Sequence, residues 1–202
     1  MAIVPLNYTP PAYTTTNVLY GVGILFTAPT GTAVPDDAHL GYGTSWTGLG
    51  WSYIGGTLDG CTLTFAPTTQ NILIEEQPTP VGVAVSTADL TITTNLSEET
   101  LSNVSLAWGN SGTQATTAPG ASQPGKTVLT LSTVFPSLAC ALIGKNQIGY
   151  ARVLSVPVVI SAGQVQTAYR RAAQQRVYPL TLSAICPFTS ITWSDLTALA
   201  TS

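Results

Sequence analysis

The chain has 202 residues, of which 45% are hydrophobic and only 7% are charged. Ordinary soluble domains carry roughly 25% charged residues, so hydroxyl and amide groups must keep this surface in water, and it has little charge to resist association. No apolar run approaches the roughly 20 residues of a membrane-spanning helix, so we expect no membrane insertion and predict that other subunits cover much of the surface.

The charges are divided along the chain. Residues 1–125 contain eight acids and no Lys or Arg, whereas residues 126–202 contain six basic residues and one acid, so the two parts carry 0 − 8 = −8 and 6 − 1 = +5. Opposite charges on two surfaces of one chain guide the approach and register of identical subunits. The pattern therefore favours self-association.

The start of the chain contains two segments without a period. Residues 1–11 are apolar and proline-rich, which predicts an extended N-terminal arm. Residues 29–50 are dense in Gly, Pro, Ala and Thr, which predicts a long loop. We interpret residues 1–202 as one domain. The N-terminus lacks the cationic and apolar regions of a signal peptide.

The middle of the chain predicts four short antiparallel strands. Asp59-Gly60 is a turn signal, and Cys61, Leu63 and Phe65 then alternate with threonines, as in a half-buried strand. The other three predicted strands are Ile72–Glu76, one around Val81–Val85 and one around Asp89–Thr93. Four strands in so short a stretch indicate an antiparallel sheet.

A helix and further strands are expected after residue 94. Asn95-x-x-Glu98 resembles a capping box, and Leu101, Val104 and Trp108 share one helical face before Gly109. Residues 111–125 are polar and predict a linker loop. The remaining predicted strands are Thr127–Phe135, Leu138–Ile143, Ala151–Ile160 and Arg176–Ile185, while residues 165–175 fit either a helix or a strand.

Residues that move protons near neutral pH are nearly missing. His39 is the single histidine and lies inside the Gly/Pro-rich loop with Asp36 and Asp37, a poor place for a preorganised base or a metal ligand set. Cys61, Cys140 and Cys186 are far apart and form no CxxC pair, so we interpret them as small buried apolar residues. We expect no enzyme, no metal and no cofactor.

Two groups of side chains invite a binding function. Trp46, Trp51 and Tyr53 would suit a stacking platform for sugars or bases, although core or interface packing is the commoner use of such rings. Arg170, Arg171 and Arg176 would suit phosphates, but a net acidic chain without interleaved aromatics favours salt bridges to a neighbouring subunit.

Three consecutive runs resemble the major tail tube protein of long non-contractile tailed phages. They are GWSYIGGTLDGCTLTF (50–65), ILIEEQPTPVGVAV (72–85) and ADLTITTNLSEETLSNVSLAWG (88–109). Residues 150–186 resemble the closing pair of long strands of that family, which favours a strand over residues 165–175. The neutral run Ala172-Ala173-Gln174-Gln175 departs from the family, which usually carries more charge there.

The resemblance implies an antiparallel β-sandwich or barrel with one short flanking α-helix. It also implies a structural virion protein: six copies form a ring, and stacked rings form a tail tube through which DNA is ejected. The implied partners are further copies of the chain, the tape-measure protein and the tail-tip and terminator proteins, with non-specific passage of genomic DNA. The implied location is the virion tail, after assembly in the host cytoplasm.

Two hypotheses assign the charges within such a tube. Glu75, Glu76 or Asp89 lines the lumen, where an acidic or neutral wall lets DNA slide. Arg170, Arg171 or Arg176 meets Asp36 or Asp37 of another subunit. The alternatives are another virion β-protein, such as a decoration or minor tail protein, and a carbohydrate-binding sandwich that uses Trp46, Trp51 and Tyr53.

Overall fold

The computed structural model describes residues 23–35, 46, 48–109, 112–145, 151–166 and 177–195. The strands are β1 (Ile24–Pro29), β2 (Ser52–Tyr53), β3 (Thr57–Ile72), β4 (Gly82–Leu96), β5 (Thr113–Thr117), β6 (Lys126–Thr130), β7 (Leu138–Lys145), β8 (Ala151–Ser161), β9 (Tyr178–Ala184) and β10 (Thr192–Asp195). In the described part of the chain they are accompanied by α1 (Leu101–Ala107) and the 3₁₀ turn η3 (Phe188–Ser190). The chain is mainly β, as the sequence predicts.

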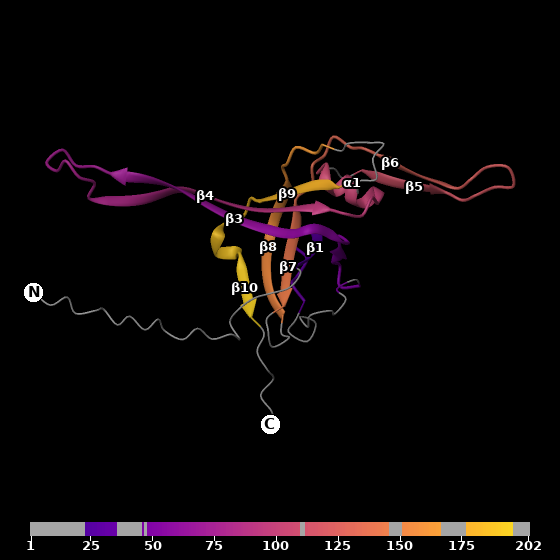
Figure 1. Cartoon of the computed structure of the whole chain (residues 1–202), viewed down its shortest axis with the longest axis horizontal. Helices are drawn as coiled ribbons and strands as arrows, with labels where there is room; N and C mark the ends of the chain where they lie inside the picture. Colours follow the sequence, from indigo (N-terminus) through magenta and orange to yellow (C-terminus); the bar gives the residue numbers. More distant parts are fainter. Residues whose placement is uncertain are drawn as a thin grey trace, which may run out of the picture.

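The main sheet is antiparallel and folds over itself into two layers. Its strand order is β2-β1-β7-β8-β9-β4-β3, with β10 paired to β8 outside this path. The strands β1, β7, β8 and β10 run crosswise to β3, β4 and β9 (Figure 1). The result is a sandwich-like fold with one flanking α-helix, in agreement with the predicted fold class.

The strand β8 bends from one layer into the other. Its first half pairs with β7 and β10, whereas Val159, Ile160 and Ser161 pair with β9. The register against β7 shifts between the Cys140–Val156 and Leu138–Val159 pairs, and Pro157 lies in this bulge. A bulge bends a strand, and proline is tolerated at one because it has no N–H to donate to the ladder.

The main core lies between the two layers. Alternate residues of β4 and β9 face it, and Ile92 and Leu182 are cross-strand partners within it. The opposite wall comes from β1, β7 and β8, through Leu25, Cys140 and Leu154. Period-2 alternation in each strand therefore buries one face of each layer.

A second cluster covers the outer face of β1, β7 and β8. Four alanines on these strands leave room for two indoles, which are buried at 0% and 2% exposure: Trp46 and Trp51, with Ala28, Ala139, Ala141 and Ala151. Trp46 stacks on Phe26 with ring centroids 5.0 Å apart. The Trp51 indole N–H donates to the Ala33 carbonyl over 2.9 Å. The two indoles thus fasten part of the 29–50 segment to the sheet.

The four short strands predicted between residues 57 and 96 are two long ones. β3 and β4 form a single hairpin of 16 and 15 residues. Asp59-Gly60 is a bulge inside β3 with φ values of 64° and 74°, instead of the predicted turn before it. Ile72–Glu76 is not a separate strand: β3 ends at Ile72, and Glu75 and Glu76 occupy the turn closed by the Gln77 N–H and the Ile74 carbonyl.

The predicted helix exists but begins later than expected. Asn95 lies in β4, and Thr100 is the N-cap, its hydroxyl accepting from the Asn103 N–H over 3.1 Å. The buried positions are Asn103 and Ala107, while Trp108 is 47% exposed. The buried face is therefore one position away from the predicted face of Leu101, Val104 and Trp108.

Glu98 and Glu99 hold neighbouring segments instead of a capping box. The Glu98 carboxylate accepts from the Gly56 N–H over 2.7 Å, next to the positive-φ Gly55. The Glu99 carboxylate accepts from the Tyr178 hydroxyl of β9 over 3.0 Å. Both acids thus connect the start of the helix to the sheet.

The predicted linker at 111–125 is corrected in part. Residues 113–117 form β5, which pairs with β6 in a second hairpin, so this polar segment is a projecting ribbon. The strand predicted over Thr127–Phe135 is confirmed only to Thr130. The strands predicted around 138–143, 151–160 and 176–185 correspond to β7, β8 and β9.

No helix of the described residues is long and apolar enough to cross a membrane.

The Asn103 side chain is expected to contribute strongly to stability. It is buried, and its amide nitrogen donates to the carbonyls of Ile54 and Glu98, each over 3.0 Å. Asn103→Ala leaves the buried Ile54 carbonyl and the part-buried Glu98 carbonyl without this donor, and should lower the free energy of unfolding by about 1–3 kcal/mol. Urea denaturation followed by tryptophan fluorescence measures it, and exposed Asn71→Ala is the matched control, expected within about 0.5 kcal/mol of wild type.

Cys61 and Cys140 are expected to react slowly in the native state. Burial raises the pKa of the Cys61 and Cys140 thiols. Since the thiolate is the nucleophile, both should react with iodoacetamide at pH 8 more slowly than free cysteine, and denaturant should remove the difference. Mass spectrometry of time points identifies each site; rapid native labelling of Cys140 would contradict its burial.

Candidate assembly surfaces

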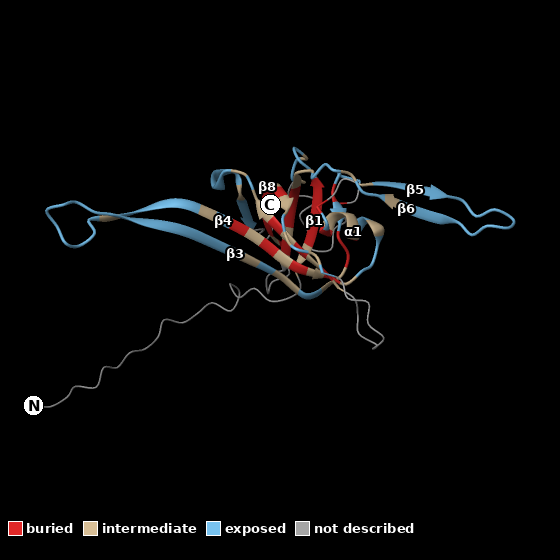
Figure 2. Cartoon of the chain, turned by 90° about the horizontal axis from the view of Figure 1, so that it is seen from above, coloured by how far each residue is buried: buried red, intermediate tan, exposed pale blue. Residues whose placement is uncertain are grey.

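A long ribbon projects from the body, and its apolar face continues the core. We call residues 65–90 the long arm; it extends to one end of the molecule (Figure 1). Cross-strand partners share a face, so Phe65, Thr69 and Asn71 lie with Leu90, Val85 and Val83. Phe65, Val83 and Val85 are 57%, 62% and 64% exposed, although on the same face Leu90 belongs to the core and the half-buried Leu63 packs against it. Figure 2 shows this change from buried to exposed along the arm.

A bulge at Ser86 keeps the valines on this face. Thr68 pairs with Thr87 and Thr69 with Val85, so Ser86 has no partner position in β3. If Ser86 took a regular ladder position instead, Val83 and Val85 would lie on the opposite face from Leu90, because successive side chains alternate. The Ser86 hydroxyl donates to the Thr68 carbonyl over 3.1 Å and secures the bulge.

The opposite face of β3, β4 and β9 is a surface of hydroxyl groups, which we call the hydroxyl face. Thr62 pairs with Thr93 and Thr93 with Thr181, giving one row across three strands. Thr64, Thr91 and Ser183 form the next row. All six residues are exposed or half-buried. These two rows can donate and accept hydrogen bonds without carrying charge.

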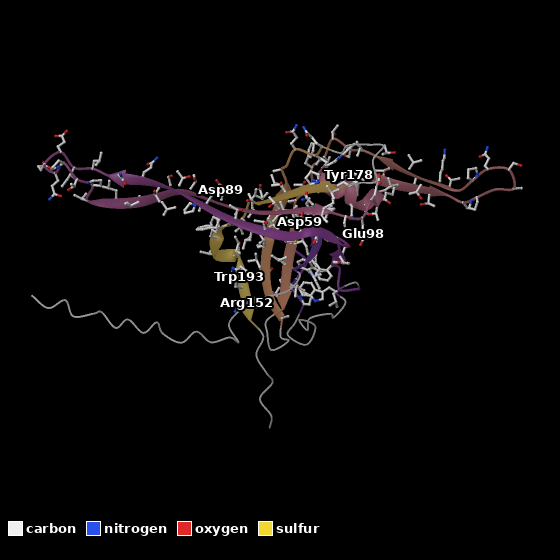
Figure 3. The ribbon with its side chains drawn as sticks, in the orientation of Figure 1. Asp59, Asp89, Glu98, Arg152, Tyr178 and Trp193 are labelled. Carbon is white, nitrogen blue, oxygen red and sulfur yellow. The ribbon has the colours of Figure 1, made fainter. Side chains whose placement is uncertain are left out.

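The three candidate lumen acids separate into two places. Asp89 is exposed on the hydroxyl face, one row beyond Thr91, where the long arm leaves the body (Figure 3). Glu75 and Glu76 lie in the turn at the tip of the arm. Their predicted position in a strand is wrong, because the ladder ends at Ile72 and both acids lie in the turn between Ile74 and Gln77.

A shorter ribbon projects from the other end of the molecule. We call residues 113–130 the short arm. Its inner face contacts the helix through Gln114, whose amide donates to the Ser102 hydroxyl over 3.0 Å. Lys126 is the only charged residue of this arm, and it is exposed. Beside it, the tip loop forms a hollow of about 460 Å³ lined by Ala118, Gly120, Ala121, Pro124 and Lys126, among others.

Core packing, the commoner use of such rings, is confirmed for Trp46 and Trp51, and the alternative stacking platform does not form. Trp46 and Trp51 are buried in the second cluster, so their faces cannot stack on a ligand, whereas Tyr53 is 52% exposed. A carbohydrate site built on these three rings is therefore disfavoured.

Several other predictions lie outside the described residues. They are the 1–11 arm, His39, the strand or helix over 167–175, and the proposed charge pairs between Asp36 or Asp37 and Arg170, Arg171 or Arg176. Their assignments stay predictions.

Sequence reasoning missed the two arms as projecting ribbons. A signal for the long arm was present, because the apolar positions change from odd numbers at Val83 and Val85 to even numbers at Leu90 and Ile92. Such a change of parity in one continuous strand indicates a bulge.

In comparisons with known proteins, no family model and no curated protein matches the chain.

The apolar face of the long arm is expected to drive self-association. Val83→Thr with Val85→Thr keeps the β-branched shape but makes this face polar, and should shift the onset of association to higher protein concentration. Light scattering over a dilution series measures the onset. Ala84→Thr, on the other face of the same strand, is the control; equal effects from both faces would contradict the assignment.

Proposed function

We propose that this chain is a structural virion protein that assembles into stacked hexameric rings and so forms the tail tube that conducts phage DNA. The proposal combines the sequence resemblance with the surfaces described above. As a tube subunit, the protein works through self-contacts and binds no cofactor.

The long arm is the observation that carries the proposal. A two-stranded ribbon is marginally stable alone in water, and this one exposes Phe65, Val83 and Val85 on a face that is continuous with the core. Exposed apolar patches of this kind mark interaction sites. With only 7% charged residues in the chain, assembly into a larger body accounts for both features.

The hydroxyl face is the proposed lumen wall. Its two rows of Thr and Ser carry no cation, and Asp89 adds a carboxylate at their end. DNA phosphates gain nothing from such a wall, because affinity for DNA comes mainly from Lys and Arg. The wall would therefore let DNA slide. Glu75 and Glu76, at the arm tip, are better placed for contacts between subunits.

Electron microscopy of the purified protein and of its parent particle tests the proposal. Tubes with a central channel, labelled along the tail by an antibody to this chain, are expected. Isolated trimers or pentamers, or labelling on the capsid, would instead support a decoration or minor tail protein.

Placing a cation on the hydroxyl face is expected to slow DNA ejection. Asp89→Lys introduces a phosphate-binding group into the proposed wall while leaving the core side of β4 unchanged, so tubes should still form. Ejection rates followed by a DNA-binding dye measure the effect, which should weaken as salt rises. Asp89→Asn is the control and should eject like wild type; unchanged ejection by Asp89→Lys in intact tubes would remove Asp89 from the lumen.

A further inference from the structure

We propose that the tip of the long arm of one copy docks into the hollow at the tip of the short arm of the next copy. The tip is residues 72–81, and the hollow is the one beside Lys126. This contact rests on the proposed function, because it supplies a link between neighbouring subunits of the assembly.

The tip presents apolar side chains followed directly by acids. Ile72, Leu73 and Ile74 are 48%, 67% and 44% exposed, which leaves much of their surface in water. Glu75 and Glu76 come next, in the turn itself. The turn is held by the Gln77 N–H to Ile74 carbonyl bond of 3.2 Å and the Val81 N–H to Ile72 carbonyl bond of 2.9 Å. A defined turn holds apolar and acidic groups side by side.

The hollow offers the complementary chemistry. Ala118, Ala121 and Pro124 give it small apolar walls, and its volume of about 460 Å³ is ample for a branched aliphatic side chain. Lys126 adds a cation to the same lining. The tip loop is also shaped from within, since the Gly120 N–H donates to the Gln123 carbonyl over 2.9 Å. An aliphatic group followed by a carboxylate matches this lining.

The positions of the two arms require separate copies. The arms project toward opposite ends of the long axis of the molecule (Figures 1 and 2), so the tip of one arm cannot reach the hollow of the same chain. A contact between two different surfaces of identical subunits is heterologous, and it repeats to form a ring or a filament. This is the symmetry that an assembly of many copies needs.

Charge complementarity identifies the occupant as a second copy. Between residues 65 and 90 the only charged residues are Glu75, Glu76 and Asp89, and between residues 112 and 137 the only one is Lys126. Each arm therefore has a single sign, and the signs are opposite, which favours the pairing of unlike arms over like arms. Nucleic acid does not fit the acidic tip, since its phosphates would be repelled.

Zero-length cross-linking tests the contact in the assembled full-length protein. A carbodiimide joins carboxylates to amines in contact, and the chain has two lysines, Lys126 and Lys145. A mixture of ¹⁴N and ¹⁵N protein, digested with chymotrypsin because residues 1–125 contain no tryptic site, should give mixed-isotope links from Glu75 or Glu76 to Lys126. Assemblies that lack this link, or that link the tip acids to Lys145 instead, overturn the proposal.

Charge exchange provides the second test. Glu75→Lys with Glu76→Lys, and separately Lys126→Glu, should each raise the concentration for half-association by about threefold to fivefold, and the combined variant should recover most of this loss. Circular dichroism checks that each variant folds. Asp89→Lys, elsewhere on the arm, should not rescue Lys126→Glu. Absence of rescue by the tip reversal, or rescue by Asp89→Lys, counts against the contact.

The two proposals can fail separately. Linked and rescued assemblies that form no tubes in micrographs would retain the contact and refute the tail tube function. Tubes without the link and without rescue would retain the function and refute the contact.

Discussion

The fold depends on the bend in β8. Its first half is hydrogen-bonded to β7 and β10, and its last three residues to β9, so a single strand connects the two layers that enclose the core. A strand that changes partners at a bulge can join two crossed layers. A single sheet can then enclose a core without a second sheet. Pro157 suits this position because a missing N–H costs nothing where the ladder is already interrupted. Every other element, from the helix to the arms, is placed by the two layers that this bend creates.

The arms extend two kinds of surface beyond the body. The same strands that bury Leu90 and Ile92 continue outward as an exposed apolar face, and their other side presents rows of threonine. One pair of strands therefore supplies a core wall, a projecting ribbon and a polar sheet face. A chain with so few charges has few other means of directing association. In the proposed assembly, the specificity of association therefore comes largely from the shapes of the arms and from the few carboxylates and ammonium groups on them.

The sequence predicted the fold class and most strands because alternation is a local signal. It did not separate one long hairpin from four short strands. Asp59-Gly60 has the composition of a turn, although it forms a bulge inside β3. Thr100 was missed as the N-cap because Asn95 has equal capping chemistry, and pairing with Pro179 in β9 decides that Asn95 stays in a strand. The buried state of Trp46 and Trp51 depends on alanines from three strands, which no local pattern contains.

The bulge at Ser86 constrains how the long arm can change in length. Because side chains alternate, inserting or deleting one residue in either strand between the body and the tip inverts every position beyond it, whereas a change of two residues preserves the faces. The single bulged residue already offsets β4 by one position. The length of this arm should therefore vary in steps of two residues. A change of one residue should occur only together with gain or loss of the bulge.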